Sequence, residues 1–438
     1  MLIKGASMKV SIFGLGYVGL VNAVCLAQEG HEIIGVDVNL QKVGMVNEGI
    51  SPITEDQVED ILKAQVAKGR LMATDQTEYA VTHSDMSFIC VGTPSTTHGT
   101  LDLTQVEHVC RQIGAVLKNL GKPHTVVMRS TMLPGSCQYM AEILANVSGL
   151  TLGQDLHIAF NPEFLREGTA VRDFYAPSYT VIGTADPYAA AMLEELYGFL
   201  VTPLERVGLA EAEMLKYACN AFHATKITFA NEIGRVAREL NVDGTKVMDL
   251  LCRDTVLNIS SAYMRPGFAY GGSCLPKDLR ALIGRARLQN TYVPLLESLA
   301  WSNQIQIEHA YEIIAQAVQS KEETIGFLGL SFKAGTDDMR ESPMVELVER
   351  FIGKGYRLLL YDKYVSLTRL MGTNKQYIQQ EIPHLAELMA EDVAYVLRMS
   401  KVLVVVNRKG PYGEVLAQAD AKTRILCIED ILSGHIRL

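Results

Sequence analysis

Residues 9–37 read KVSIFGLGYVGLVNAVCLAQEGHEIIGVD, and this stretch decides the fold. An apolar strand, Lys9–Phe13, runs through the turn GLGYVG at 14–19 into an apolar helical segment and a second strand, Glu32–Val36. Asp37 follows that second strand directly. Strand, glycine turn, helix, strand and acid in this order form the fingerprint of a dinucleotide-binding Rossmann unit. The stretch therefore predicts an α/β fold with a doubly wound parallel sheet.

The three glycines of this turn have separate expected roles. Gly14 makes the tight turn, Gly16 lets a pyrophosphate approach the backbone, and Gly19 lets the helix pack against the strand. Asp37 can accept hydrogen bonds from ribose hydroxyls, and its charge repels a 2′-phosphate. The sequence therefore favours NAD over NADP.

The composition is that of an ordinary globular protein, with 48% hydrophobic and 20% charged residues in a chain of 438. This length predicts two or three domains. The net charge of -9 argues against a general nucleic-acid binder. The eight cysteines form no metal-type spacing, so neither a metal site nor a disulfide framework is expected. With no signal peptide or transmembrane run in view, we expect a cytoplasmic protein whose thiols are reduced.

Further apolar strands end in polar residues, at 86–91, 125–129 and 157–160. Open α/β sheets bind ligands at the carboxyl ends of their strands. For any one of these residues a capping or turn role is the commoner explanation. Their shared position favours a common cleft, with four candidates: Thr93, Thr131, Glu163 and Glu167.

A long helix without proline is predicted from Ala210 to Leu240. Polar residues recur on one of its faces at the helical period, among apolar neighbours. These residues are Lys216, Asn220, His223 and Asn231. Either this face is exposed to solvent, or the helix is largely buried and the face looks into a cleft. The charged residues between Glu232 and Glu239 are predicted to form a solvated end.

The stretch GGSCLPKD at 271–278 is organised around one thiol. Two glycines allow a close backbone approach, and Pro276 suits the first turn of a helix. Cys274 would then lie at a helix N-terminus, which favours the thiolate. Lys277 and Asp278 add a cation and an acid. A free cysteine is more often a small buried hydrophobe, but that role has no need of these neighbours.

The strand and glycine-turn pattern returns after the polar stretch 319–323, in Thr324–Leu330, and a later strand ends in Asp362. This indicates a second Rossmann-like unit with a different ligand. Lys333 and Arg340 lie in the loop after its first strand, where they suit phosphates, and Arg265 is either a phosphate clamp or a surface residue. The expected domains are an NAD-binding Rossmann domain at 1–205, a central helical domain at 206–320 and a second Rossmann-like domain, for a different ligand, at 321–438.

These motifs together resemble the UDP-glucose/GDP-mannose dehydrogenase family over nearly the whole chain. The residues that carry the resemblance are GLGYVG at 14–19, VGTP at 91–94, RST at 129–131, NPEFLRE at 161–167 and GGSCLPKD at 271–278. FHATKITFANEIG at 222–234, YMRPGFAYGGSC at 263–274 and SFKAGTDDMRESP at 331–343 are similar to the branch that acts on GDP-mannose.

The resemblance implies a four-electron, NAD-dependent oxidation at C6 of a nucleotide-linked sugar, giving GDP-mannuronate for an alginate-like polysaccharide. It implies catalytic roles for Cys274, Lys216, Asn220, Asp278, Glu167 and Thr131. It implies that NAD contacts Tyr17, Val18, Asp37, Lys42, Thr93, Thr131 and Lys277. It implies that the nucleotide sugar contacts Glu163, Glu167, Lys216, Asn220, His223, Asn231, Tyr263, Arg265, Lys333 and Arg340. It also implies a homodimer through the long helix.

Three alternatives stay open at this point. The same chemistry on UDP-glucose or a UDP-N-acetyl-hexosamine fits the shared motifs. A single-step β-hydroxyacid-type dehydrogenase also joins a Rossmann domain to a helical one, but it lacks the thiol loop and the second nucleotide domain. A non-catalytic nucleotide-sugar sensor would bind without turnover.

Overall fold

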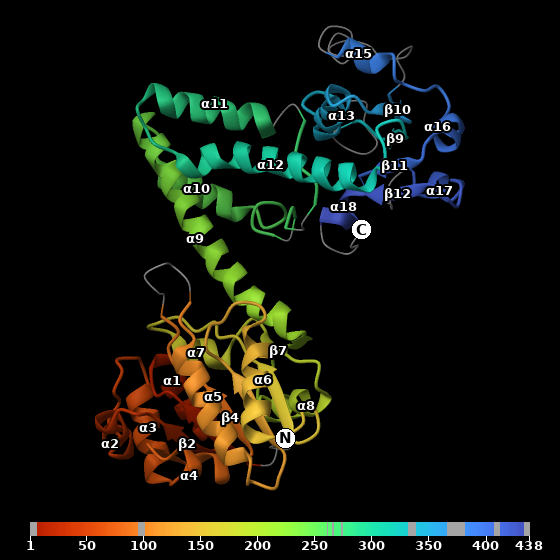
Figure 1. Cartoon of the computed structure of the whole chain (residues 1–438). Helices are drawn as coiled ribbons and strands as arrows, with labels where there is room; N and C mark the ends of the chain where they lie inside the picture. The colour runs from red at the N-terminus through yellow and green to blue at the C-terminus, as the bar shows by residue number, and fades with distance from the viewer. Residues whose placement is uncertain are drawn as a thin grey trace. The chain divides into compact units, whose positions relative to one another are not determined.

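The computed structural model describes residues 7–94, 101–260, 262–264, 267–272, 275–331, 339–365, 382–406 and 412–432. The chain divides into two compact units, residues 1–224 and 225–438 (Figure 1). We describe each unit by itself. Within the described residues, no helix is long and apolar enough to cross a membrane.

The N-terminal unit is built on one eight-stranded sheet in the order β3-β2-β1-β4-β5-β6-β7-β8. Its strands are β1 (Lys9–Phe13), β2 (Glu32–Val36), β3 (Leu71–Thr74), β4 (Met86–Ile89), β5 (His124–Met128), β6 (Leu156–Phe160), β7 (Thr180–Gly183) and β8 (Leu204–Val207). The order reverses between β1 and β4, which is where doubly wound sheets bind ligands. The prediction of a parallel sheet is confirmed with one difference. β6 and β7 pair antiparallel, and β7 then pairs parallel with β8.

Eight helices cover this sheet among the described residues of the N-terminal unit up to β8. They are α1 (Tyr17–Glu29), α2 (Leu40–Asn47), α3 (Val58–Ala67), α4 (Thr77–Thr82), α5 (Thr104–Leu117), α6 (Ser136–Ser148), α7 (Ala170–Tyr175) and α8 (Pro187–Leu196). Successive side chains of a strand point to opposite faces, so two cores form. Val127 packs with α1, α3, α7 and α8, whereas its neighbours Val126 and Met128 pack with α4, α5 and α6. Burial on both faces explains why these strands are continuously apolar.

The long helix α9 (Leu209–Glu239) matches the predicted helix to within one residue at each end. The boundary between the two units falls inside it. Two buried glutamates hold its ends in place. Glu213 accepts hydrogen bonds from the N–H groups of Gly135 and Cys137, at the start of α6. Glu232 accepts from the N–H groups of Leu295 and Leu296, in the first turn of α12 (Pro294–Ala317).

Glu232 corrects the prediction that the end of this helix is solvated. Its carboxylate is completely buried, because it satisfies two of the N–H groups that a helix N-terminus leaves without partners. A carboxylate at this end of a helix also interacts favourably with the helix dipole. The neighbouring Arg238 is exposed, as predicted.

The C-terminal unit continues with helices α10 (Gly244–Arg253), α11 (Leu275–Leu288) and α12, and then a four-stranded parallel sheet. The sheet order is β10-β9-β11-β12, with β9 (Thr324–Leu328), β10 (Arg357–Tyr361), β11 (Val402–Val405) and β12 (Arg424–Cys427). The accompanying helices are α13 (Pro343–Gly353), α15 (Pro383–Ala386), α16 (Val393–Met399), α17 (Gly413–Leu416) and α18 (Ile428–Leu432). The second Rossmann-like unit is therefore confirmed, whereas the two boundaries between the three predicted domains stay predictions.

Candidate functional site

The first glycine turn has the geometry that the fingerprint predicts. Gly14 has a φ of +94°, and its N–H donates to the Val36 carbonyl at 2.7 Å. A Cβ on Gly14 would lie 3.0 Å from the backbone of Cys90, and one on Gly19 would lie 1.8 Å from the Gly14 carbonyl oxygen. A Cβ on Gly16 would meet no atom within 4 Å. Gly14 and Gly19 are thus fixed by the fold, and Gly16 leaves open space beside the helix N-terminus.

Asp37 holds this turn and also faces a cavity. One of its carboxylate oxygens accepts from the Leu15 N–H at 2.9 Å, and the other accepts from the Asn39 N–H at 2.9 Å. Lys42 lies 3.8 Å away. Asp37 and Lys42 line a cavity of about 260 Å³ together with Gly14. The space, the open glycine edge and the carboxylate fit the adenosine half of a dinucleotide.

Thr93 and Thr131 follow different strands, and the structure brings them together. The Thr93 hydroxyl donates to the Thr131 carbonyl at 2.9 Å. Thr93 comes after β4 and Thr131 after β5, at the same sheet edge as the glycine turn after β1 but across the switch point from it. Val18 lies in the first turn of α1, beside the same turn.

Lys216 and Glu163 form a partly buried ion pair. The Lys216 Nζ lies 3.3 Å from a Glu163 carboxylate oxygen, and the side chains are 11% and 13% exposed. The Lys216 ammonium also lies 5.6 Å from the centre of the Phe164 ring. The pair joins the start of α9 to the loop that follows β6. Glu167, further along that loop, is exposed.

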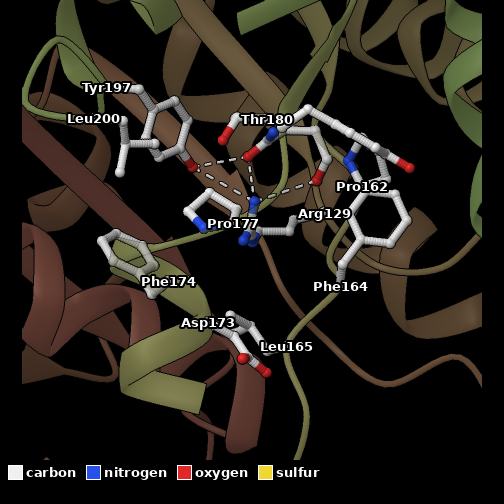
Figure 2. Close-up of a pocket in the computed structure, with 12 residues that line it drawn as sticks. Arg129, Pro162, Phe164, Leu165, Asp173, Phe174, Pro177, Thr180, Tyr197 and Leu200 are labelled. Atoms are coloured by element: carbon white, nitrogen blue, oxygen red, sulfur yellow. Dashed lines mark hydrogen bonds between the residues drawn. The ribbon is translucent and has the colours of Figure 1, made fainter. Parts of the chain in front are cut away.

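Arg129 is a buried residue to which the sequence pattern gave no role. Its Nη1 donates to the side chain of Asn161 and, at 3.4 Å, to the hydroxyl of Tyr197. Figure 2 shows the Arg129 guanidinium facing the Tyr197 hydroxyl. The Tyr197 hydroxyl in turn donates to the Asn161 side chain at 2.8 Å. Arg129 therefore fixes the residue at which the loop carrying Glu163 begins. Its sequence signal is a charged residue directly after an apolar strand.

The middle of α9 is exposed all round in the single chain, which agrees with the first of the two alternatives for its polar face and not with a largely buried helix. Residues 220–228 are exposed on every face, including Asn220 and His223. Asn231 is exposed as well, whereas Lys216 is buried. Exposed apolar residues lie among the polar ones, with Phe222 at 43% and Ile227 at 64% exposure. The helical period placed the polar residues correctly on one face, but it carried no information on what covers that face.

Cys274 lies outside the described residues, but its neighbours show how the loop around it is held. Gly272 has a φ of +89°, and its N–H donates to the Glu341 carbonyl at 3.2 Å. A Cβ on Gly271 would lie 2.4 Å from that same carbonyl oxygen. The two glycines therefore allow a close approach to the loop before α13, whereas the predicted approach to a ligand stays a prediction.

Helix α11 begins at Leu275, directly after the cysteine, and Pro276 lies in its first turn as predicted. Lys277 and Asp278 form an exposed ion pair of 3.0 Å. Arg280, one turn further on, makes two hydrogen bonds of 2.6 and 2.8 Å to the Glu341 carboxylate. The first turn of α11 is thereby tied to the loop that supports the glycines.

The other predicted nucleotide-sugar residues are distributed as follows. Tyr263 has a φ of +61° and is 87% exposed. Arg340 is half-buried and precedes Glu341. Arg265 and Lys333 lie outside the described residues. Asn231, Tyr263, Lys277, Asp278 and Arg340 belong to the C-terminal unit, and Glu163, Lys216, Asn220 and His223 belong to the N-terminal unit.

Several described cysteines are unsuited to act as nucleophiles. Burial raises the pKa of the Cys25, Cys90 and Cys110 thiols to about 12 and that of Cys137 well above its usual value. A thiolate is the reactive form of cysteine, so these four side chains serve packing.

Three family models match successive parts of the chain. The model described as UDP-glucose/GDP-mannose dehydrogenase family, NAD binding domain, matches residues 8–201. The central domain of the same family matches residues 210–305, and its UDP binding domain matches residues 326–419.

Relatives that match most of the chain are also named as nucleotide-sugar dehydrogenases. A GDP-mannose 6-dehydrogenase of Pseudomonas putida is 49% identical over 420 residues, which span 96% of this chain and 95% of that protein. A UDP-glucose 6-dehydrogenase of Haloferax volcanii is 36% identical and covers 81% of this chain and 83% of its own. The crystal structure of a ternary complex of GDP-mannose dehydrogenase from Pseudomonas aeruginosa is similar with a TM-score of 0.92 and 47% identity, covering 96% of both chains.

Proposed function

This chain belongs to the UDP-glucose/GDP-mannose dehydrogenase family, and on that premise we propose that it oxidises the C6 hydroxyl of GDP-mannose to a carboxylate. It is an NAD-dependent nucleotide-sugar dehydrogenase. The observation that carries the choice of GDP-mannose is the whole-length likeness to GDP-mannose dehydrogenase, which is much higher than the likeness to UDP-glucose dehydrogenase. GDP-mannuronate, the product, would feed the synthesis of an alginate-like polysaccharide.

NAD accepts the hydrides of this oxidation, and the N-terminal cavity fits it. Asp37 would accept hydrogen bonds from the adenosine ribose, with Lys42 beside it. The pyrophosphate would lie against the open edge at Gly16 and the N-terminus of α1, near Tyr17 and Val18. Thr93 and Thr131, already joined by a hydrogen bond, would contact the cofactor beyond the switch point, and Lys277 would lie near the nicotinamide.

Cys274 would carry the second half of the oxidation. The first hydride leaves C6 and the hydroxyl loses its proton, which gives an aldehyde. The thiolate adds to the aldehyde carbon, and the resulting thiohemiacetal loses its hydroxyl proton and a second hydride to become a thioester. Water then attacks the thioester, which releases the carboxylate and restores the thiolate. Each sugar therefore reduces two NAD.

Polar residues of the site would stabilise and direct these steps. The thiohemiacetal forms through an oxyanion, for which Lys216 and Asn220, one turn apart on α9, would supply donors. Attack by water needs a base or an orienting carboxylate. Asp278, or Glu167 with Thr131, would fill that role.

The remaining polar residues would hold the nucleotide sugar. Binding in the N-terminal unit would use Glu163, Glu167, Lys216, Asn220 and His223. Binding in the C-terminal unit would use Asn231, Tyr263, Arg265, Lys333 and Arg340. The cations suit the two phosphates of the substrate, since a guanidinium fork can bind a phosphate through two hydrogen bonds.

We further propose a homodimer through α9, because exposed apolar residues such as Phe222 and Ile227 lie along its middle. The enzyme would act in the cytoplasm, where thiols are kept reduced.

A panel of nucleotide sugars offered with NAD tests the assignment. GDP-mannose should be oxidised with two NADH formed per sugar, and UDP-glucose and UDP-N-acetyl-hexosamines should be poor substrates. Turnover with a UDP-sugar alone would select the UDP-glucose branch. One NADH per sugar would support single-step alcohol oxidation, and binding without turnover would indicate a sensor.

A further inference from the structure

Glu55 lies in the connection between α2 and α3, and its carboxylate accepts hydrogen bonds from three donors. One oxygen accepts from the Tyr17 hydroxyl and, at 2.6 Å, from the Gly168 N–H. The other oxygen accepts from the Ala170 N–H at 2.9 Å. These donors are far from Glu55 in the sequence and belong to two different segments. Glu55 therefore joins two separate parts of the N-terminal unit.

The first part is the glycine turn. Tyr17 is the first residue of α1 and follows Gly16, where the backbone leaves open space. A helix N-terminus at the end of such a turn is where a dinucleotide places its phosphates. A cofactor that binds there contacts the segment to which the Tyr17 hydroxyl belongs.

The second part is the loop from Asn161 to Thr169, which carries Glu163 and Glu167. Near the end of this loop, the Arg166 guanidinium makes hydrogen bonds of 2.6 and 2.9 Å to Asp173, in α7. Arg166 lowers the pKa of Asp173 to about 2, so this ion pair persists at any working pH. The Tyr17 hydroxyl also lies 3.4 Å from the Arg166 carbonyl oxygen. The loop is thus held by this ion pair near Thr169 and meets the glycine turn at Glu55 and Tyr17.

A carboxylate suits this junction better than any neutral side chain. Burial acts to raise the pKa of Glu55, but hydrogen bonds from Tyr17, Gly168 and Ala170 outweigh it and lower that pKa. Hydrogen bonds to an ionised acceptor are about twice as strong as neutral ones. A glutamine offers one acceptor oxygen, and its NH₂ group would face a backbone N–H. At least one donor would then lose its partner.

We propose that Glu55 is a positioning residue that couples the cofactor site to the loop carrying Glu163 and Glu167, so that NAD and the nucleotide sugar bind cooperatively. The inference rests on the proposed function, because it takes Glu163 and Glu167 as contacts of the sugar. Binding at the glycine turn fixes Tyr17, which fixes Glu55, which fixes Gly168 and Ala170. By thermodynamic reciprocity the nucleotide sugar tightens cofactor binding by the same factor.

Calorimetry with GDP-mannose, with and without saturating NADH, measures this coupling without turnover, because NADH cannot reduce the alcohol. In the wild-type enzyme NADH should lower the Kd of GDP-mannose by about fivefold or more, the usual range of such couplings. In Glu55→Gln and in Tyr17→Phe the factor should fall close to one. The double variant should lose no more than either single variant, since both break one connection.

Asp56→Asn is the matched control. Asp56 is the neighbouring exposed residue, its hydrogen bond goes to Gln57, and the variant should keep the wild-type factor. The proposal is overturned if the wild-type enzyme shows no coupling, if Glu55→Gln keeps it, or if Tyr17→Phe keeps it while Glu55→Gln loses it. Thermal melting by circular dichroism checks that each variant is folded, and if Glu55→Gln is not, Tyr17→Phe decides alone.

The wild-type titration separates this proposal from the functional one. If GDP-mannose fails to bind and a UDP-sugar binds instead, the choice of substrate is wrong, and the same coupling is then measured with that UDP-sugar. If GDP-mannose binds and no coupling exists, the role of Glu55 is wrong while the function stands.

Discussion

Cys274 is the residue on which the proposed chemistry depends. In Cys274→Ser the hydroxyl cannot form the thioester, so acid formation should fall to background while NAD affinity stays within about twofold of wild type. An assay of uronic acid formation checks the loss of chemistry, and NAD binding followed by fluorescence checks that cofactor affinity is retained. A large loss of NAD affinity in this variant would place the thiol in cofactor recognition instead.

Asp37 holds the glycine turn and is the proposed partner of the ribose, which makes two substitutions more informative than one. Asp37→Ala removes the proposed ribose partner and the acceptor of the Leu15 N–H, so NAD affinity should fall by tenfold or more, at about 1.5–3 kcal/mol for a lost charged hydrogen bond. Asp37→Asn keeps an acceptor and removes the charge. It should lose less NAD affinity and gain affinity for NADP, which titrations with both cofactors measure. Equal affinity for NAD in all three proteins would contradict the assignment of the cavity.

At the scale of the element, strand β5 begins with a histidine that the fold keeps neutral. His124 is completely buried, its Nε2 lies 2.7 Å from the Ser87 hydroxyl, and burial lowers its pKa to about 3. The unfolded chain takes up a proton on this ring below about pH 6.5, but the folded chain does so only near pH 3. The stability that this ring contributes is therefore present above pH 6.5 and is lost as the pH falls.

Replacing His124 by Gln should make the free energy of unfolding depend less on pH in this range. Between pH 8 and pH 5.5 the wild-type chain should lose about 1.4 kcal/mol more than His124→Gln, which corresponds to one pH unit below the unfolded pKa. Urea unfolding followed by circular dichroism at both values measures the difference. The exposed His83→Gln should keep the wild-type slope, and an identical slope in His124→Gln would show that the ring is protonated in the folded state.

The elements that the sequence predicted best are those defined by local patterns. Strands β1 and β2 begin and end at the predicted residues, because apolar runs bounded by glycine and acid mark them directly. Glu55 and Glu232 were not predicted to be structural, since their donors lie far away in the chain. A charged residue beside other polar residues gives no sign that a distant helix N-terminus covers it.

In the candidate site, too, local motifs were predicted from the sequence and contacts with distant residues were not. Motifs identified Asp37, Thr93 and Thr131. The structure shows that Asp37 lines a cavity and that Thr93 and Thr131 are joined by a hydrogen bond. The pattern on α9 gave the correct face but could not show that the middle of the helix is exposed. Periodicity reports which residues share a face, whereas burial depends on what packs against it.

At the scale of the whole molecule, the exposed stretch of α9 predicts the effect of one charge. Ile227→Glu places a carboxylate on the proposed dimer surface, so the chain should become monomeric while each unit stays folded, because the side chain is already 64% exposed. Light scattering after size-exclusion chromatography measures the mass. Val201→Glu, the same kind of change at a residue 96% exposed in the N-terminal unit, should leave the dimer intact. A dimeric Ile227→Glu protein would place the interface elsewhere.

The two Rossmann-like units share the conformation of the turn after their first strand, but different residues pack against that turn. Gly329 has a φ of +92°, and the Leu330 N–H donates to Asp362 at 2.7 Å, as the Leu15 N–H does to Asp37. In the second unit, however, the ring of Tyr412 packs within 3.1 Å of where a Cβ on Gly329 would lie. At Gly14, to which Gly329 corresponds, a Cβ would instead meet the backbone of Cys90, so different neighbours cover the two turns.

The anchoring of α9 by Glu213 has a consequence for anyone who wishes to excise the nucleotide-binding half. A truncation after residue 205 keeps every strand of the first sheet except the last two residues of β8, but it leaves the amides of Gly135 and Cys137 without their acceptor and removes Ala212, which packs against Gly183. A self-sufficient fragment therefore has to retain the opening turns of the long helix, so the place to cut lies inside that helix.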